Sequence, residues 1–353
     1  MNQPPVLARR SLLSAGLGAL ALGLTACAGA EAPAAAALDT PLTESVPKGT
    51  KLVVGDKEHQ WAIEFSGEVK NLTFEVEFAN LSGGPETLEA FRARALDLGS
   101  VADIPPIHSH WTNIPTKIVA SKYRQDPLNH AIYRLGIAPG AGVGTLADIR
   151  GKKVAYSPGQ AQGALVLRVL QKAGLRKEDV QLIELPSTGD VYANALASRQ
   201  VEVAPIGGVQ IRRYENKYGK DGATTIAHGL RDDPGHLYAP ITVLADPAKA
   251  AAIREYVQVW ARAWRWREAN PDEWIERYYV KKQGLSAEDG KWIVANAGVA
   301  DIPASWTDAI ARHQETIDLL AKETGNKPLK AEDLYDRRFE TVAADALAAG
   351  GAK

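Results

Sequence analysis

Short apolar runs alternate with amphipathic segments along most of the chain after residue 50. Three runs, 51–55, 72–78 and 96–101, have the length and alternation of strands, and 86–95 has the spacing of a helix. Strands that alternate with helices in this way are typical of parallel sheets covered by helices. The pattern therefore predicts that a first α/β lobe begins near residue 50.

A second α/β unit follows from about residue 145. A helical turn leads into a strand at 153–156, and the loop 157–163 opens a helix that Gly174 ends. Strands are then expected at 180–185 and 201–206, separated by a helix for which Asp190 is a plausible N-cap.

The chain changes character near residue 237, because almost everything after it has helical spacing. One last strand is expected at 241–244, followed by helices over 248–268, 272–282, 286–297 and 304–324, with Ser286 and Asp289 forming a capping box. Late helices of this kind suit a chain that returns to cover an earlier sheet. Six of the eight tryptophans fall in this region, and we assign them to the core or the lobe surface rather than to a ligand site.

The N-terminus has the layout of a cleaved secretory signal. Arg9 and Arg10 precede an apolar run over 12–24 that is too short for a membrane helix, and small residues precede Cys27. The segment resembles a bacterial lipoprotein signal, which implies a signal peptide at 1–26 and lipidation at Cys27. The alternative is a buried apolar helix that ends in an incidental cysteine, and export by the Sec or the twin-arginine route stays open. Residues 27–49, rich in Ala and Pro, are expected to be a flexible tether.

Composition limits the function of the exported part. Cleavage before Cys27 would leave 353 − 26 = 327 residues with a formal charge of −1 − 2 = −3, because the signal carries two arginines and no acid. No basic cluster interleaved with aromatics predicts nucleic-acid binding. Cys27 is the only cysteine, so the exported fold has none for a disulfide, a thiolate metal site or a nucleophile. We expect no metal and no cofactor.

Five segments together carry a family resemblance. They are 83–90, 95–99, 103–106, 146–154 and 334–339, and their order and spacing extend over roughly residues 50–340. The chain resembles the substrate-binding proteins of ABC importers for aliphatic sulfonates, taurine and nitrate.

The resemblance implies a periplasmic-binding-protein type II fold, in which two α/β lobes joined by a two-segment hinge hold a ligand in the cleft between them. Lobe 1 is then expected at 50–140 and 241–345, and lobe 2 at 141–240. The implied function is that of a monomeric receptor, lipid-anchored outside the cell membrane. It would bind a small anionic solute and deliver it to a membrane permease that works with an ATPase subunit.

Two loops are the main candidates for the ligand site. Residues 82–84 and 157–162 each lead into a predicted helix N-terminus, where unpaired backbone N–H groups and the helix dipole attract anions. The alternative for each loop is an ordinary helix cap. The candidate ligand-binding residues of these loops are Ser82, Gly83, Gly84, Ser157, Gly159, Gln160 and Gln162.

Further candidates come from other strand ends and from positions that relatives use. Asp103 either meets a polar part of the ligand or caps the following turn, and His108 follows the expected turn at Pro105 and Pro106. Histidines 108 and 110 alone do not make a metal site. The remaining candidate ligand-binding residues are Asp56, Gln60, Trp61, Pro105, Gly207, Gly208 and His236.

Two departures from the family leave the ligand open. Relatives often have an aromatic and acidic cluster where this chain has 206–208, and a less charged loop than 55–59. A zwitterion such as taurine, or a heterocycle such as a thiamine precursor, would also be tolerated. Enzymes on the same scaffold, including desulfinases that use a cysteine nucleophile, are the alternative class. A lipoprotein that only senses ligand for a partner protein would share fold and site.

Overall fold

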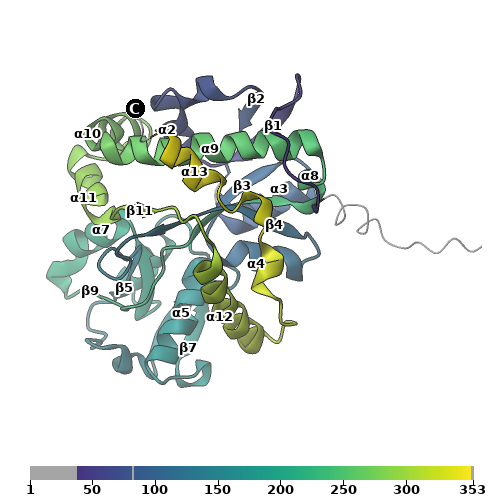
Figure 1. The fold of residues 1–353 in the computed structure, drawn as a ribbon. Helices are drawn as coiled ribbons and strands as arrows, with labels where there is room; N and C mark the ends of the chain where they lie inside the picture. The colour runs from purple at the N-terminus through teal and green to yellow at the C-terminus, as the bar shows by residue number, and fades with distance from the viewer. Residues whose placement is uncertain (1–37, 82, 351–353) are drawn as a thin grey trace, which may run out of the picture.

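The computed structural model describes residues 38–81 and 83–350, and these residues form two lobes, each built on a mixed β-sheet (Figure 1). The first sheet has six strands in the order β11-β4-β10-β3-β1-β2, and the second has five in the order β7-β6-β8-β5-β9. In each sheet parallel strands pair on one side and antiparallel strands on the other. The predicted two-lobed α/β fold is confirmed.

The strands are β1 Lys51–Gly55, β2 Glu75–Phe78, β3 Leu98–Val101, β4 Thr116–Arg124, β5 Tyr133–Ile137, β6 Lys153–Tyr156, β7 Gln181–Glu184, β8 Val203–Gly207, β9 Thr224–Ile226, β10 Gly235–Pro240 and β11 Ala300–Asp301. The α-helices are α2 His59–Phe65, α3 Gly84–Arg92, α4 Ile104–Trp111, α5 Ala161–Lys172, α6 Val191–Ala197, α7 Val209–Tyr218, α8 Ile241–Leu244, α9 Pro247–Ala269, α10 Pro271–Trp274, α11 Ala287–Ala297, α12 Thr307–Thr324 and α13 Val342–Gly350. A π-helix over Ile275–Val280 continues α10.

Most predicted elements are present within a few residues of their expected bounds. The Ser286 side chain accepts a hydrogen bond from the Asp289 backbone N–H, which is one half of the expected capping box. The Asp289 carboxylate pairs instead with Arg212 and Arg213. Asp190 stands at the N-cap of α6, although its side chain makes no capping hydrogen bond.

The strand expected at 241–244 is wrong, because these residues form the short helix α8. The preceding residues form β10, which ends at Pro240, where the missing backbone N–H interrupts the ladder. An apolar run of four residues does not distinguish strand from helix by its periodicity. The turn expected at Pro105 and Pro106 is also wrong, since both prolines occupy the first turn of α4, where no N–H donor is needed.

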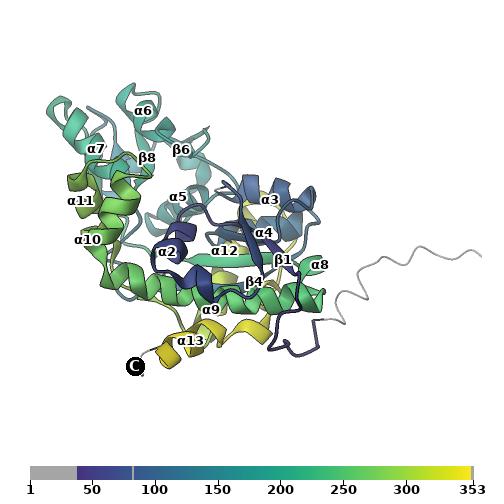
Figure 2. The same ribbon diagram turned by 90° about the horizontal axis from the view of Figure 1, so that it is seen from above.

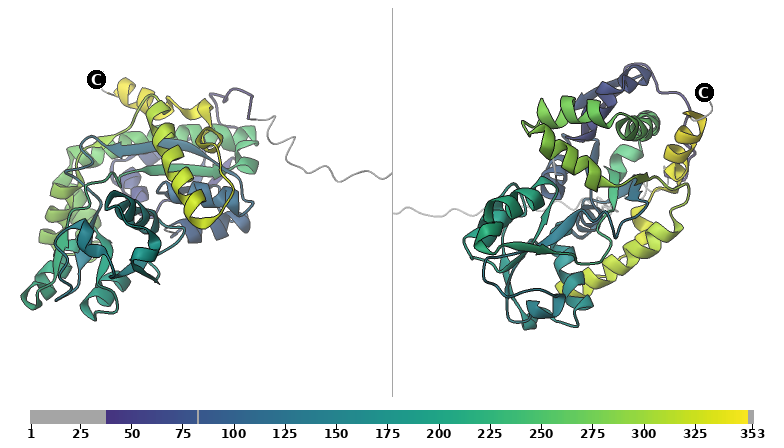
Figure 3. Two further views of the ribbon diagram at one scale, coloured as in Figure 1. Left: turned by 90° about the horizontal axis from the view of Figure 1, so that it is seen from below. Right: turned by 90° about the vertical axis from the view of Figure 1, so that its left-hand side faces the viewer.

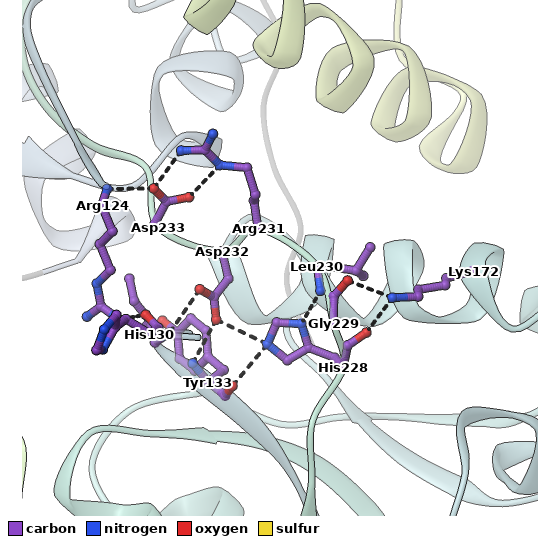
Figure 4. A network of polar contacts seen from close by, with 11 residues as sticks. Arg124, His130, Tyr133, Lys172, His228, Gly229, Leu230, Arg231, Asp232 and Asp233 are labelled. Carbon is purple, nitrogen blue, oxygen red and sulfur yellow. Dashed lines mark hydrogen bonds and ion pairs between the residues drawn. The ribbon is translucent and has the colours of Figure 1, made fainter. Parts of the chain in front are cut away.

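Two connections join the lobes, one from β4 to β5 and one from β9 to β10. Both lie N-terminal to the lobe boundaries expected at 140/141 and 240/241, so β5 lies in the second sheet and β10 in the first. Asp232 accepts hydrogen bonds from the Ile132 and Tyr133 backbone N–H groups at 2.9 and 2.7 Å (Figure 4). Asp233 accepts one from the Arg124 N–H at 2.7 Å. Two adjacent carboxylates therefore fasten the two connections to each other.

The C-terminal helices mostly complete the first lobe. Helix α9 buries ten residues, eight of them in that core, and α13 packs along it (Figure 2). Trp260, Trp274 and Trp306 are buried there, as assigned from the sequence, whereas Trp292 of α11 packs against the second core. In both views of Figure 3, α12 extends toward the second lobe, where Glu323 pairs with Lys177 at 3.2 Å.

The described part begins inside the expected tether. Leu38, Leu42 and Val46 pack against the first core, and the Thr40 carbonyl accepts a hydrogen bond from Arg338 at 3.1 Å. Apolar side chains at intervals of four thus attach residues 38–49 to the lobe, which shortens the expected tether. The signal peptide predicted at 1–26 and the lipidation at Cys27 lie outside the described residues. Among the residues described, no helix is long and apolar enough to cross a membrane.

Candidate functional site

A cavity of about 480 Å³ lies between the two lobes, where the N-termini of α3 and α5 meet. Gly83, Gly84 and Pro105 line it from the first lobe, and Gln160 and Gln162 from the second. The structure therefore brings together residues from both predicted loops. This cavity is called the cleft below.

Glycine is required on the first-lobe side for two different reasons. Gly83 has φ 86° and ψ 157°, a conformation that side chains with a Cβ rarely adopt. A Cβ at Gly84 would lie 2.4 Å from Pro105 Cγ, closer than any ordinary contact. The two glycines let α3 begin against α4, with its first N–H groups at the cleft.

The second-lobe side is shaped in the same way. Gly159 has φ +80°, and a Cβ at Gly163 would lie 2.1 Å from the Ser157 carbonyl oxygen. Gln160 accepts a hydrogen bond from the Ser187 hydroxyl, and the Gln162 amide lies 3.5 Å from the Ser187 carbonyl. The loop 157–162 is thus folded tightly onto the first turn of α5.

The cleft offers hydrogen-bond donors without cationic side chains. The first N–H groups of α3 and α5 have no intrahelical acceptor, and the positive ends of both helix dipoles point at the same space. Among the described residues that line the cleft, Glu86 is the one with a charged side chain. An anion bound here would be held by backbone dipoles and neutral side chains.

A smaller cavity of about 230 Å³ extends the cleft into the second lobe and shares Tyr133, Gln162 and Ser187 with it. Gly207 lines this extension, where a Cβ would lie 2.8 Å from the Tyr133 ring. Gly208 is the N-cap of α7, with φ 56°. Both predicted glycines therefore stand beside the extension, Gly207 in its wall and Gly208 at the next position.

A third cavity, of about 110 Å³, lies in the first lobe and shares Ser100 with the cleft. Asp56 and His59 line it and are buried, and neither Asp56 Oδ2 nor His59 Nδ1 has a hydrogen-bond partner in the described part. Burial raises the pKa of Asp56 to about 7 and lowers that of His59 to about 3. His59 is then neutral, and because its Nε2 lies 2.9 Å from the Trp260 carbonyl, Nε2 carries the proton and Nδ1 is an acceptor.

Lys122 and Arg267 bring positive charge to this third cavity from β4 and α9. Both cations lie over the Trp264 ring, at 4.5 and 4.7 Å from its centroid. Burial lowers the pKa of Lys122 to about 8. The third cavity thus combines an unpartnered carboxyl oxygen of Asp56 and an unpartnered ring nitrogen of His59 with two cations and an aromatic wall.

Asp103 and His236 lie on another side of the first lobe. The Asp103 carboxylate is 3.5 Å from Arg168 of α5, and its carbonyl accepts a hydrogen bond from His313 Nε2 at 2.8 Å. His236 stacks on His313 with ring centroids 5.7 Å apart and also borders the third cavity. These residues hold the lobes together near the hinge, and Asp103 does not line the cleft.

The other predicted site residues are scattered. His108 packs against Gly159, whose Cβ position is 3.4 Å from the ring, so it contacts the second-lobe loop. Ser157 is buried beneath that loop. Gln60 donates to the Lys57 carbonyl at 3.2 Å, and Trp61 lies under Lys282, so neither lines the cavities described here. Ser82 lies outside the described residues.

Several residues that line these cavities were not selected from the sequence. Ser187 and Thr188 follow β7, so the rule that ligands meet the carboxyl ends of parallel strands would have found them. Lys122 and Arg267 come from distant parts of the chain and had no such signal. Within 38–81 and 83–350, no group of three or more His, Cys, Asp or Glu residues is placed to hold a metal ion.

Comparisons with known proteins agree with this architecture. Residues 75–274 match the family described as NMT1/THI5 like. A relative from Escherichia coli (strain K12) named "Putative aliphatic sulfonates-binding protein" is 31% identical over 134 residues, which are 38% of this chain and 39% of the relative. The chain thus matches about two fifths of the length of this curated relative.

Solved structures share the fold over most of the chain. The alkanesulfonate-binding protein SsuA from Xanthomonas axonopodis pv. citri, bound to MOPS, superimposes with a TM-score of 0.65 at 20% identity, covering 86% of this chain and 98% of that one. The desulfurization enzyme DszB superimposes with a TM-score of 0.58 at 13% identity, covering 85% and 99%. The matched segment exceeds half of the chain, and the fold agrees with it: the chain belongs to the NMT1/THI5-like family.

Proposed function

We propose that this protein is an extracytoplasmic solute receptor that binds a small organic anion, most directly an aliphatic sulfonate or taurine. In this proposal it delivers the solute to the membrane permease of an ABC importer. One observation carries the proposal: two helix N-termini, one from each lobe, open into a single cavity of about 480 Å³. That volume lies in the range of small-molecule sites.

Backbone recognition suits a receptor that must release its ligand. An anion between α3 and α5 would accept N–H groups from both lobes, and would thereby favour the arrangement in which the lobes approach each other. Among the described residues that line the cleft, no arginine or lysine would hold the anion further. Closure about the two connections between the lobes would then present a liganded form to the permease.

The relatives support the same class of ligand. The curated relative is named for aliphatic sulfonates, and the Xanthomonas structure holds MOPS, a sulfonate. The lipid anchor at Cys27 and the position outside the cell membrane belong to the proposal and depend on the sequence resemblance. Among the described residues that line the cleft and its two neighbouring cavities there is no cysteine, which argues against a mechanism of the desulfinase type.

Isothermal titration calorimetry of the purified protein tests the proposal. The panel is methanesulfonate, taurine, nitrate, a pyrimidine and the uncharged methanesulfonamide. We expect heat from the sulfonates and none from the sulfonamide, which has the shape without the charge. Heat from the pyrimidine alone would replace the anion with a heterocycle as ligand. Product formation from a bound sulfonate would show an enzyme.

Gln162→Glu is the matched variant for the cleft. Gln162 lies in the first turn of α5 and lines both the cleft and its extension, and glutamate has nearly the same size. Its charge should weaken sulfonate binding by about tenfold or more, since like charges repel in a partly enclosed site. Gln200→Glu, at an exposed position of the same lobe, is the control and should bind as the wild type does.

A further inference from the structure

A second cavity between the lobes, of about 380 Å³, lies away from the cleft, where α5 and α12 pack near the hinge. We call it the hinge cavity. The cleft is lined by the first turn of α5, whereas the hinge cavity is lined by Arg168, Gln171 and Lys172 from the second half of the same helix. Its opposite wall is α12, and Leu230, Arg231 and Pro234 of the β9–β10 connection close one side.

The lining of the hinge cavity has an excess of basic side chains. Four of its residues are cationic and two are anionic, in contrast to the cleft, and Leu230, Pro234, Ala309 and Leu319 add apolar surface. The cationic residues are Arg168, Lys172, Arg231 and Arg312, and the anionic ones are Asp103 and Glu315.

Three of the four cations are already occupied. Arg168 pairs with Asp103 at 3.5 Å, and Arg231 holds the Asp233 carboxylate through two hydrogen bonds of 3.1 and 2.9 Å. Lys172 donates to the carbonyls of His228 and Gly229 at 3.2 and 2.6 Å (Figure 4).

Arg312 is different. Its guanidinium lies over the Tyr123 ring, 5.1 Å from the centroid, and has no hydrogen bond or ion pair with any residue in the described part. Arg312 is partly buried. A guanidinium that has lost part of its water and has gained no anion is the group a carboxylate or phosphate would bind most strongly.

The cavity belongs to both lobes at once. Helix α5 contributes Ala164 and Leu167 to the first core and Val166 and Val169 to the second. Helix α12 contributes Ile317 to the first core. A molecule between these helices would therefore contact a wall from each lobe.

We infer that the hinge cavity is a second binding site, for a small organic carboxylate or phosphate, whose acidic group pairs with Arg312 while its apolar part lies against Leu230 and Leu319. This site is independent of the solute proposed for the cleft. The volume fits a molecule of metabolite size. The ligand must carry a negative charge, because its acidic group pairs with Arg312.

Calorimetric titration of the full chain at constant ionic strength tests the inference, with glutarate, phenyl phosphate and uncharged glutaramide as probes. We expect glutarate or phenyl phosphate to bind, and glutaramide to give no heat. The better of the two anions tells whether the site prefers carboxylate or phosphate. Arg312→Gln should weaken anion binding by about tenfold or more. Arg254→Gln is the matched control, because Arg254 is also partly buried on a long helix but lies outside the cavity.

Two comparisons separate this site from the cleft and from unspecific binding. Gln162→Glu, which alters the cleft, should leave glutarate binding unchanged. If Arg312→Gln does not fold, Leu319→Glu adds a negative charge to the same wall and should weaken binding equally. The inference is overturned if neither anion binds the wild type, if both arginine variants lose the same affinity, which means an adventitious ion only, or if binding depends on Gln162.

Discussion

The cleft and the hinge cavity lie at opposite ends of α5 and use opposite means to attract an anion. The cleft has helix N-termini, glycines and amide side chains and no cation among its lining residues. The hinge cavity has three arginines and a lysine, most of them already paired. Both lie between the lobes and have similar volumes of about 480 and 380 Å³.

The cleft and the hinge cavity should therefore tolerate different kinds of substitution. In the cleft the donors belong to the backbone, so what must be kept is the loop conformation that exposes them. In the hinge cavity the donors are cationic side chains, so it is the charge of these side chains that must be kept. Glycine variants should therefore distort the cleft, whereas variants that remove a cationic side chain should weaken anion binding in the hinge cavity.

The largest effect is expected from Gly163→Ala. The added Cβ would meet the Ser157 carbonyl oxygen at 2.1 Å, and because this neighbour is backbone, the loop 157–162 or α5 must move. We expect a loss of about 3 kcal/mol in the free energy of unfolding, measured by urea denaturation.

Gly219→Ala is the control for that variant. Gly219 has φ −59°, and nothing lies within 4 Å of its Cβ position. Its free energy of unfolding should change by less than about 0.5 kcal/mol. An equal loss in both variants would contradict the close packing of the cleft loop.

The next effect concerns the third cavity and its pH dependence. The folded-state pKa of Asp56 is raised from 3.8 to about 7 by burial, so the folded protein binds a proton there that the unfolded chain releases. This acid therefore lowers stability as pH rises from about 4 to 7. Asp56→Asn removes that loss. The free energy of unfolding of the variant minus that of the wild type should therefore increase by about 2 kcal/mol from pH 5 to pH 7.

Comparing the wild type with Asp56→Asn at each pH cancels the contributions that the other titrating groups make to the free energy of unfolding. His59, Glu58, Lys122 and Arg267 surround Asp56 and are present in both chains. His59 alone has the opposite pH dependence, because burial lowers its pKa from 6.5 to about 3. Between these pH values the unfolded chain binds a proton that the folded protein does not, so stability falls as pH falls. A difference between wild type and variant that stays constant with pH would show that Asp56 is ionised throughout.

A smaller effect is expected at the hinge. Arg168→Gln removes the partner of Asp103 and a hydrogen bond to Thr316, leaving a nearly buried carboxylate between the lobes. Because the Arg168 side chain is 23% exposed, we expect a loss of about 1 kcal/mol rather than the value for a dry pair.

Arg150→Gln provides the matched control for the hinge variant. Arg150 pairs with Asp179 at 2.6 Å, but its side chain is 60% exposed, so the change should be near zero. Chemical denaturation of both variants gives the comparison. An equal or larger loss for Arg150→Gln would contradict the expectation that the less exposed pair between the lobes contributes more.

The sequence was most informative where structure is local. Glycines at 83, 84 and 159 marked loops before helices, and the structure gives each a steric or conformational reason. Long amphipathic helices such as α9 and α12 were predicted nearly to their ends.

What the sequence could not supply depends on contacts between distant residues. Asp103 had two readings from the sequence, a ligand contact or a turn cap, and the structure adds partners that no local pattern connects to it, Arg168 and Thr316. Strand β4 was missed because polar and charged residues interrupt its apolar pattern. Lys122 and Arg267 meet over Trp264 only because α9 packs behind the sheet.

Calorimetric titration of methanesulfonate, with methanesulfonamide as its uncharged counterpart, is the most direct test of anion binding in the cleft. If two helix N-termini hold an anion between the lobes, the sulfonate binds, the sulfonamide does not, and Gln162→Glu weakens the binding by about tenfold or more while Gln200→Glu does not. Equal binding of both compounds, or sulfonate binding that Gln162→Glu leaves unchanged, would contradict anion binding by the two helix N-termini.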